Sequence, residues 1–267
     1  MSEDLIETFE DGVATLTMNR PQARNAMSGG MMTALAEAVP RLANDPKVRL
    51  VVLTGAGGAF CAGGDVKGFA ADAGSTNAKP LTIDERAASL REGTKVSELL
   101  NEMPKPTLAI IPGACAGAGL SLALSCDLRM VVDTAKITTA FSKIAASGDY
   151  GGSWFMTQLV GAAKARELYF TADVILGTEA HRLGLANKLV SAETLEEETK
   201  AYTKYLANLP TIAIGYMKKN LNMAQQGSLA QVLDLESGHM VRSMATEDHK
   251  AAAVAFVEKR APEFKGH

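Results

Sequence analysis

Residues 105–130 read KPTLAIIPGACAGAGLSLALSCDLRM and combine four structural signals in one stretch. The apolar run Pro106–Ile111 predicts a buried strand that ends in a turn of very small residues. A helix is expected at Leu120–Ser125, and Leu128–Val132 predicts a second strand. The order strand, helix, strand indicates parallel pairing and therefore an α/β core.

The first part of the chain carries the same kind of pattern. Ile6–Phe9 and Val13–Met18 alternate apolar and polar residues around Asp11-Gly12, which predicts a β-hairpin. Val48–Leu53 predicts a buried strand that leads directly into Thr54-Gly55-Ala56-Gly57-Gly58. Two buried strands of this protein thus end in turns of very small residues.

An amphipathic helix is expected between these strands. It follows Asn25 and ends at Asn44-Asp45-Pro46. Its apolar positions are Met27, Met31, Leu35, Val39 and Leu42.

The C-terminal part reads differently, because the pattern from Ser191 onward is almost wholly helical. Thr194-x-x-Glu197 resembles a capping box, and Pro210 interrupts the helical segment. We therefore expect an α/β core at 1–190 and a helical C-terminal subdomain at 191–267.

The formal charge of −3 gives no electrostatic footprint for nucleic acid or for an anionic membrane. No run approaches the roughly 18 apolar residues of a membrane span, and the acidic N-terminus lacks an apolar signal core. Cys61, Cys115 and Cys126 have no metal-ligand spacing and are expected to be buried thiols. A cytoplasmic protein is the expectation.

The first glycine-rich turn, TGAGGAFCAGGD at 54–65, could belong to a dinucleotide site. Its G-x-G start is followed by Phe60 where the fingerprint needs glycine, and no acidic strand end follows at the expected distance. A dinucleotide site is therefore disfavoured.

The second turn contains Gly119-Leu120-Ser121-Leu122-Ala123, close to the nucleophile elbow of serine hydrolases. The final glycine is absent, and the four histidines lie in polar or helical surroundings typical of solvated residues: His181, His239, His249 and His267. A hydrolase using Ser121 stays open as an alternative.

The two turns together suggest a third kind of site. Small residues let a ligand approach the backbone, and N–H groups at turns and helix starts lack internal partners. Two such groups that converge on one oxygen make an oxyanion hole.

Four stretches resemble the enoyl-CoA hydratase/isomerase (crotonase) superfamily, and the resemblance covers nearly the whole chain. They are TMNRPQARNAMS (17–28), VVLTGAGGAFCAGGDVKGF (51–69), KPTLAIIPGACAGAGLSLALSCDLRM (105–130) and GDYGGSWFMTQLVGAAKARELYFTAD (148–173). The resemblance implies a spiral of ββα units, a helical C-terminal trimerisation region, and trimers or paired trimers. It also implies an acyl-CoA thioester as substrate, with no metal and no further cofactor.

By position in these stretches, the backbone N–H groups of Gly64 and Ala118 would form the oxyanion hole. The resemblance also assigns coenzyme A contacts: the backbone of Ala62, Asp65 and Val66 for the adenine, and the side chains of Arg24 and Lys67 for the phosphates.

Dedicated hydratases of this family carry two glutamates, and the matching positions here are Ser121 and Phe141. Neither is a carboxylate, so the two-glutamate hydration mechanism is not expected. Asp149 matches a catalytic aspartate of other relatives, such as ring-epoxide and enoyl-CoA isomerases and a chlorobenzoyl-CoA dehalogenase. Burial beside Phe141 and Trp154 would raise its pKa into the range of a useful base.

Three functions are open at this point. The leading one is an acyl-CoA isomerase or hydratase with Asp149 as its acid/base. A non-catalytic acyl-CoA-binding protein is the second, and in it Asp149 would merely cap the helix expected near Gly151. The serine hydrolase is the third.

Overall fold

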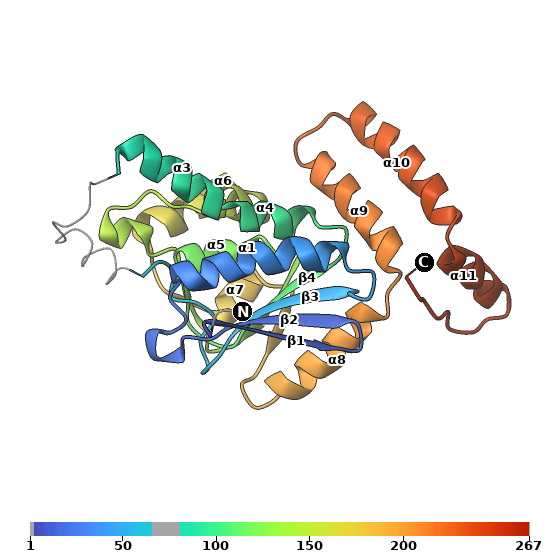
Figure 1. Ribbon diagram of the computed structural model, residues 1–267, viewed down its shortest axis with the longest axis horizontal. Coiled ribbons are helices and arrows are strands. Elements are labelled where there is room, and N and C mark those ends of the chain that lie inside the picture. Colours follow the sequence, from blue (N-terminus) through green and yellow to red (C-terminus); the bar gives the residue numbers. More distant parts are fainter. Residues whose placement is uncertain (1–2, 66–80, 267) are drawn as a thin grey trace.

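The computed structural model describes residues 3–65 and 81–266, and their strands form two sheets (Figure 1). The larger sheet has the strand order β1-β2-β3-β4-β6-β9. Its strands are β1 (Leu5–Glu10), β2 (Val13–Met18), β3 (Leu50–Gly55), β4 (Thr107–Ile111), β6 (Leu128–Val132) and β9 (Lys188–Val190). Apart from the antiparallel hairpin β1–β2, all of its strands pair in parallel.

The smaller sheet collects a short strand from each crossover. It contains β5 (Cys115–Ala116), β7 (Lys136–Thr138) and β8 (Ile175–Leu176) in that order. The chain leaves β4 through β5 into helix α5 (Ala118–Leu124), and leaves β6 through β7 into helix α6 (Gly152–Thr171). This repeated strand–strand–helix unit is the predicted ββα arrangement.

The remaining helices cover the sheets and build the C-terminal part. They are α1 (Gly29–Asn44), α3 (Ile83–Gly93), α4 (Lys95–Glu102), α7 (Gly177–Arg182), α8 (Leu195–Ala207), α9 (Thr211–Ala224), α10 (Leu229–Met244) and α11 (Glu247–Val257), with the 3₁₀ turns η1 (Pro21–Ala23) and η2 (Phe141–Ile144). Helix α8 packs on β2 and β3, whereas α9 and α10 pack together and extend away from the sheet (Figure 1). The division at residue 190 stays a prediction.

The start of α1 differs from the expectation. The helix begins at Gly29 and is capped by Ser28, whose hydroxyl accepts the N–H of Met31. Met27 lies before the helix and pairs with Gly64. Asn25 is fully buried, and its side-chain amide donates to the carbonyls of Ala56 and Ala59, so it fixes the first glycine-rich turn.

Other local predictions fared unevenly. The hairpin and the strand at Leu128–Val132 are confirmed, and Pro210 does separate α8 from α9. The capping box at Thr194 is wrong, because the Thr194 side chain makes no capping hydrogen bond to α8. All three cysteines are buried free thiols, as predicted.

Arg49, directly before β3, joins the core to the C-terminal part. Its guanidinium donates to the carbonyls of Leu209 and Phe264 and to the Thr211 hydroxyl. Asp248 accepts the N–H groups of Lys265 and Gly266 and so holds the tail beside α11. These contacts place the start of α9 and the tail at the amino-terminal ends of the parallel strands.

No helix among the described residues is long and apolar enough to cross a membrane.

Candidate active site

The two glycine-rich turns meet at the carboxyl ends of β3 and β4. Cys61 and Cys115 form an isolated parallel bridge, and the Ala116 N–H donates to the Cys61 carbonyl at 2.9 Å. Parallel neighbouring strands point their carboxyl ends to one edge of the sheet, so the following turns are brought together.

Glycine makes this contact possible. A Cβ on Gly119 would lie 2.6 Å from the Cys61 carbonyl oxygen, which is too close for any other residue. A Cβ on Gly63 would lie 3.4 Å from the Ala118 nitrogen. The backbone just before Gly64 therefore lies against the start of α5.

The N–H groups of Gly64 and Ala118 lie on these adjoining segments. Ala118 is the first residue of α5, and the positive φ of 53° needed at the helix start falls on Gly117, so Ala118 keeps an ordinary backbone. Neither N–H has a hydrogen-bond partner in residues 3–65 or 81–266. Both are therefore available as donors to a ligand oxygen.

Asp149 lies in the segment between η2 and α6. Its carboxylate oxygen Oδ1 is buried and has no hydrogen-bond partner among the described residues. Loss of solvation raises the pKa of Asp149 to about 6. The alternative role as a helix cap is wrong, because α6 is capped by Gly151 without any side-chain hydrogen bond.

Ser121 and Phe141 lie together near Asp149 and share one neighbour, Tyr169. The Tyr169 ring stacks on Phe141 with centroids 6.0 Å apart, and the Ser121 hydroxyl lies close to the phenol. A Cβ on Gly152 would lie 2.1 Å from Ser121 Oγ and 2.5 Å from the Tyr169 hydroxyl. Helices α5 and α6 are therefore in direct contact at this point.

Two tyrosines of the site, Tyr150 and Tyr169, were not predicted from the sequence. Burial raises the pKa of Tyr150 and of Tyr169 to about 12, and the negative charge of Asp149 contributes to both shifts. Both phenols are thus close enough to Asp149 for its charge to act on them. At neutral pH both stay protonated and can donate a hydrogen bond. Tyr150 directly follows Asp149 in the sequence and could have been noticed, whereas nothing in the sequence marks Tyr169.

Trp154 lies on the first turn of α6, and its ring makes an edge contact with Phe155 at 5.0 Å. Together with Tyr150 these side chains line a cavity of about 380 Å³ between the start of α6 and helix α4. The cavity adjoins the segment that carries Asp149, because Tyr150 lines it.

The candidate coenzyme A contacts also gather in space. The Arg24 carbonyl accepts the Ala62 N–H at 2.9 Å, and the exposed Arg24 side chain has no ion-pair partner in the described chain. Asp65 pairs with Arg20 at 3.3 Å. Val66 and Lys67 lie outside the described residues.

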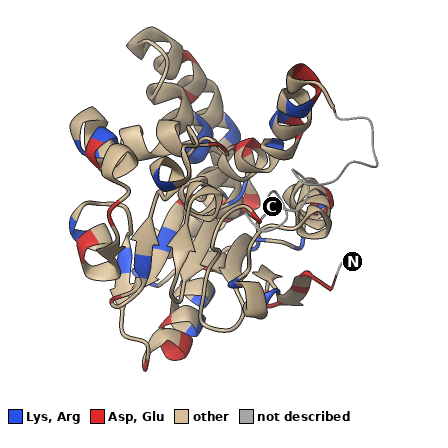
Figure 2. Cartoon of the chain, turned by 90° about the vertical axis from the view of Figure 1, so that its left-hand side faces the viewer, with Lys and Arg blue, Asp and Glu red and all other residues tan. Residues whose placement is uncertain are grey.

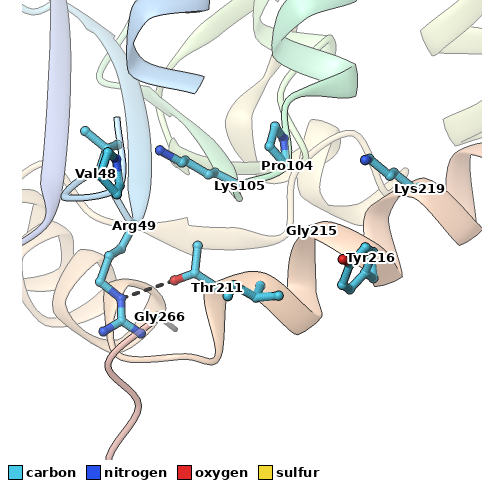
Figure 3. Close-up of a pocket in the computed structure, with 11 residues that line it drawn as sticks. Val48, Arg49, Pro104, Lys105, Thr211, Gly215, Tyr216, Lys219 and Gly266 are labelled. Atoms are coloured by element: carbon cyan, nitrogen blue, oxygen red, sulfur yellow. Dashed lines mark hydrogen bonds between the residues drawn. The ribbon is translucent and has the colours of Figure 1, made fainter. Parts of the chain in front are cut away.

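A further cavity of about 270 Å³ lies at the opposite end of β3 and β4 (Figure 3). It is lined by the start of α9 and by the cations Arg49, Lys105 and Lys219. The ammonium group of Lys105 donates to the Leu42 and Asp45 carbonyls. The Arg49 guanidinium donates to the Leu209 and Phe264 carbonyls and to the Thr211 hydroxyl. This cavity is a structural junction, far from the glycine-rich turns.

Among the described residues, Ser121 has no histidine beside it to serve as the base of a serine hydrolase. Its hydroxyl contacts the Gly117 carbonyl and Tyr169, and none of the histidines in the described chain hydrogen-bonds to it. His239 is buried, stacks on Tyr216 and hydrogen-bonds Asn220, so the prediction of a solvated residue is wrong for it. Within the described residues, no group of three or more His, Cys, Asp or Glu side chains could hold a metal ion.

The sequence matches the profile of the enoyl-CoA hydratase/isomerase family over residues 8–267. It is 33% identical over 266 residues to a 1,2-epoxyphenylacetyl-CoA isomerase from Escherichia coli K12, covering 100% of both chains. Identity to a crotonyl-CoA hydratase from Syntrophomonas wolfei is 32% over 263 residues, 98% of both chains. An enoyl-CoA hydratase structure from Polaromonas sp. JS666 superposes with a TM-score of 0.89 at 32% identity, covering 97% of this chain and 99% of that one. The predicted crotonase-like fold with C-terminal helices is confirmed.

Proposed function

Because this chain belongs to the enoyl-CoA hydratase/isomerase family, we propose that it moves the double bond of an enoyl-CoA thioester with Asp149 as its single acid/base. The observation that carries this proposal is the carboxylate itself. Asp149 is partly buried, and its Oδ1 has no hydrogen-bond partner among the described residues. Its pKa of about 6 leaves roughly nine-tenths of the carboxyl groups ionised at pH 7. A carboxylate in this state is a competent base.

The proposed reaction is a proton shuttle on one face of the acyl group. The thioester oxygen accepts hydrogen bonds from the Gly64 and Ala118 N–H groups, which stabilise the charge that develops there. Asp149 removes a proton from the α or γ carbon, and the electron pair moves into the carbonyl to give a dienolate. The protonated Asp149 then returns the proton to the other of these two carbons, and the double bond has moved. No cofactor beyond the coenzyme A of the substrate is required.

Hydration by a single carboxylate is the second candidate. Ser121 Oγ lies beside Tyr169, so a hydroxyl pair occupies the region where dedicated hydratases are expected to carry one glutamate. These hydroxyls could orient a water molecule but could not move its proton at neutral pH, because the pKa of Tyr169 is about 12. This favours isomerisation, and the products of turnover distinguish the two reactions by the mass of one water.

The test is exchange of α and γ protons of bound acyl-CoA with deuterated water, followed by NMR. Asp149→Asn is expected to slow exchange at least about 100-fold while acyl-CoA binding persists. Asp173→Asn, at an exposed aspartate, is the matched control and should leave exchange unchanged. Unchanged exchange in Asp149→Asn would refute Asp149 as the base.

The same experiment addresses the other functions. A non-catalytic binding protein would bind acyl-CoA without exchange in the wild type. A hydrolase would release free coenzyme A, and this release would disappear in Ser121→Ala.

Coenzyme A recognition by Arg24 and Lys67 belongs to the same proposal. Arg24 is exposed beside the Ala62 backbone, where a phosphate could reach it. Arg24→Ala should weaken binding of free coenzyme A in calorimetry, with Arg260→Ala as control, since Arg260 already pairs with Glu258. Equal affinities of both variants and the wild type would remove Arg24 from the site.

We also infer a homotrimer, or a dimer of trimers, built through the C-terminal helices. Large apolar side chains are exposed along α9, α10 and α11: Met217, Leu221, Leu229, Leu233, Met240, Val241, Met244, Val254, Phe256 and Val257. An apolar surface of this extent is typical of a protein–protein interface.

A further inference from the structure

The cavity of about 380 Å³ beside Asp149 has one aromatic wall. Tyr150, Trp154 and Phe155 form this wall at the start of α6. Aromatic residues make up only 5% of the sequence and Trp154 is the sole tryptophan, so three aromatic side chains lining one cavity are a local enrichment. Such a wall offers ring faces and edges to a ligand.

Tyr150 connects the cavity to the reacting carboxylate. It is 7% exposed, it lines the cavity, and its pKa responds to the charge of the neighbouring Asp149. A Cβ on Gly93, at the end of α3, would lie 3.5 Å from the Tyr150 hydroxyl. Tyr150 and Gly151, which directly follow Asp149 in the chain, thus place the cavity next to the segment that carries the carboxylate.

Another wall is polar and comes from α4 and the residue before it. Thr94, Ser97 and Asn101 line it at helical spacing. Ser97 is 3% exposed, and its Oγ has no hydrogen-bond partner among the described residues. A buried hydroxyl without a partner favours a ligand that brings an acceptor oxygen.

The charges around the cavity disfavour an anionic ligand. Arg91 is paired with Glu98 at 2.5 Å, and Glu102 adds a further negative charge to the lining. A second carboxylate on the acyl group would thus meet repulsion.

From this cavity we propose that the acyl group carries a neutral ring, and that the ring bears an oxygen. The substrate class would be aromatic or cyclic acyl-CoA thioesters, an assignment that rests on the proposed function of Asp149. A ring presents a flat face to Trp154 and Phe155, whereas a saturated chain has neither a π-face nor an acceptor for Ser97. Cavities of about 150 Å³ already bind benzene, so the available volume is sufficient.

The test compares two thioesters with the same number of acyl carbons, phenylacetyl-CoA and octanoyl-CoA, by calorimetry on the whole protein. We expect phenylacetyl-CoA to bind about tenfold tighter. Trp154→Leu keeps an apolar side chain at this position and should bring the two affinities within about twofold. Phe170→Leu, at a 74% exposed position of the same helix, is the matched control and should keep the preference.

The role of the Ser97 hydroxyl as a donor to a ring oxygen is tested with the 2-, 3- and 4-hydroxyphenylacetyl-CoA esters. Ser97→Ala should weaken at least one of them about tenfold and leave phenylacetyl-CoA unchanged. Unchanged affinity for all three would overturn the role of Ser97.

Ligand binding and proton exchange are measured separately, so the ring site and the chemistry at Asp149 can fail independently. Equal affinities, or tighter binding of octanoyl-CoA, would overturn the ring assignment even if Asp149-dependent proton exchange is observed. Tight ring binding without proton exchange would instead refute the proposed chemistry and leave the ring site standing.

Discussion

Asp149 holds one carboxylate oxygen, Oδ1, where no described group donates a hydrogen bond to it. The ionised form therefore loses solvation without compensation, and the pKa rises from 3.8 to about 6. A shift of this size corresponds to about 3 kcal/mol between the two protonation states. The same environment that makes Asp149 a usable base thus makes its ionised form destabilising for the folded protein.

The first prediction concerns the pH dependence of turnover. Only ionised Asp149 can accept a proton, so kcat/KM should rise with pH through about 6 and reach a plateau above it. Initial rates between pH 4.5 and 8 measure this profile. A profile that is flat between pH 5 and 7 would contradict it.

The second prediction concerns stability. Because the pKa of Asp149 is higher in the folded protein than in the unfolded chain, its contribution to stability is present at low pH and lost as the pH rises through about 6. Asp149→Asn should therefore raise the free energy of unfolding at pH 8 by about 1–2 kcal/mol, less than the full shift because the carboxyl group is partly solvated. Below about pH 4 the gain should vanish.

Urea denaturation of both proteins at pH 4 and pH 8 measures this difference. Asp173→Asn serves again as the control, since that side chain is exposed. A variant that is equally stable or less stable at pH 8 would show that Asp149 is not destabilising when ionised.

At the scale of elements, glycines decide how closely the pieces of the site approach. Gly119 lets α5 rest on the first glycine-rich turn, and Gly152 lets α6 rest on Ser121. This packing brings together the segments that carry the two N–H donors. The site therefore depends on backbone contacts between segments that are far apart in the sequence.

The third prediction tests this dependence. In Gly119→Ala the new Cβ would meet the Cys61 carbonyl at 2.6 Å, so the turn must move. We expect a loss of stability of about 1–3 kcal/mol and a further loss of exchange activity. Gly29→Ala, which meets nothing within 4 Å at the start of α1, is the matched control and should be neutral or slightly stabilising.

Thermal and urea unfolding with the deuterium-exchange assay provide the measurements. An active Gly119→Ala variant of normal stability would show that the two turns need not touch.

For the whole molecule, the C-terminal helices extend away from the sheet (Figure 1). Large apolar side chains are exposed along these helices. Figure 2 shows basic and acidic residues interspersed along the chain. The Arg49 contacts fix the start of α9 and the tail to the core. The apolar helices are therefore presented in a defined orientation.

The fourth prediction is the mass in solution. Light scattering after size exclusion should give three or six times the chain mass of 28.1 kDa. Val241→Glu, at a 68% exposed position of α10, should dissociate the assembly, whereas Ile83→Glu, 84% exposed at the start of α3, should not. A monomeric wild type at micromolar concentration would contradict the proposed assembly.

Asp149, Gly64 and Ala118 were chosen through the family resemblance, and their roles stay predictions. The sequence alone was sufficient for the β-hairpin, the strand at Leu128–Val132 and the glycine-rich turns. These features are local, because alternation, apolar runs and glycine clusters act over a few residues. Helix starts were less reliable: Ser28 caps α1, and Thr194 forms no capping box. Several polar residues that suit a helix start lie near each terminus, and only the folded backbone selects among them.

Only the tertiary structure decided what surrounds Asp149. Tyr169 reaches Ser121 and Phe141 because α5, η2 and α6 converge, and no local pattern records that convergence. Asn25 and His239 were likewise misjudged, since burial of a polar side chain depends on distant segments that pack over it. The raised pKa of Asp149 and the cavity beside Tyr150 arise in the same way. Desolvation and cavity shape are properties of the packed chain, and a linear pattern does not contain them.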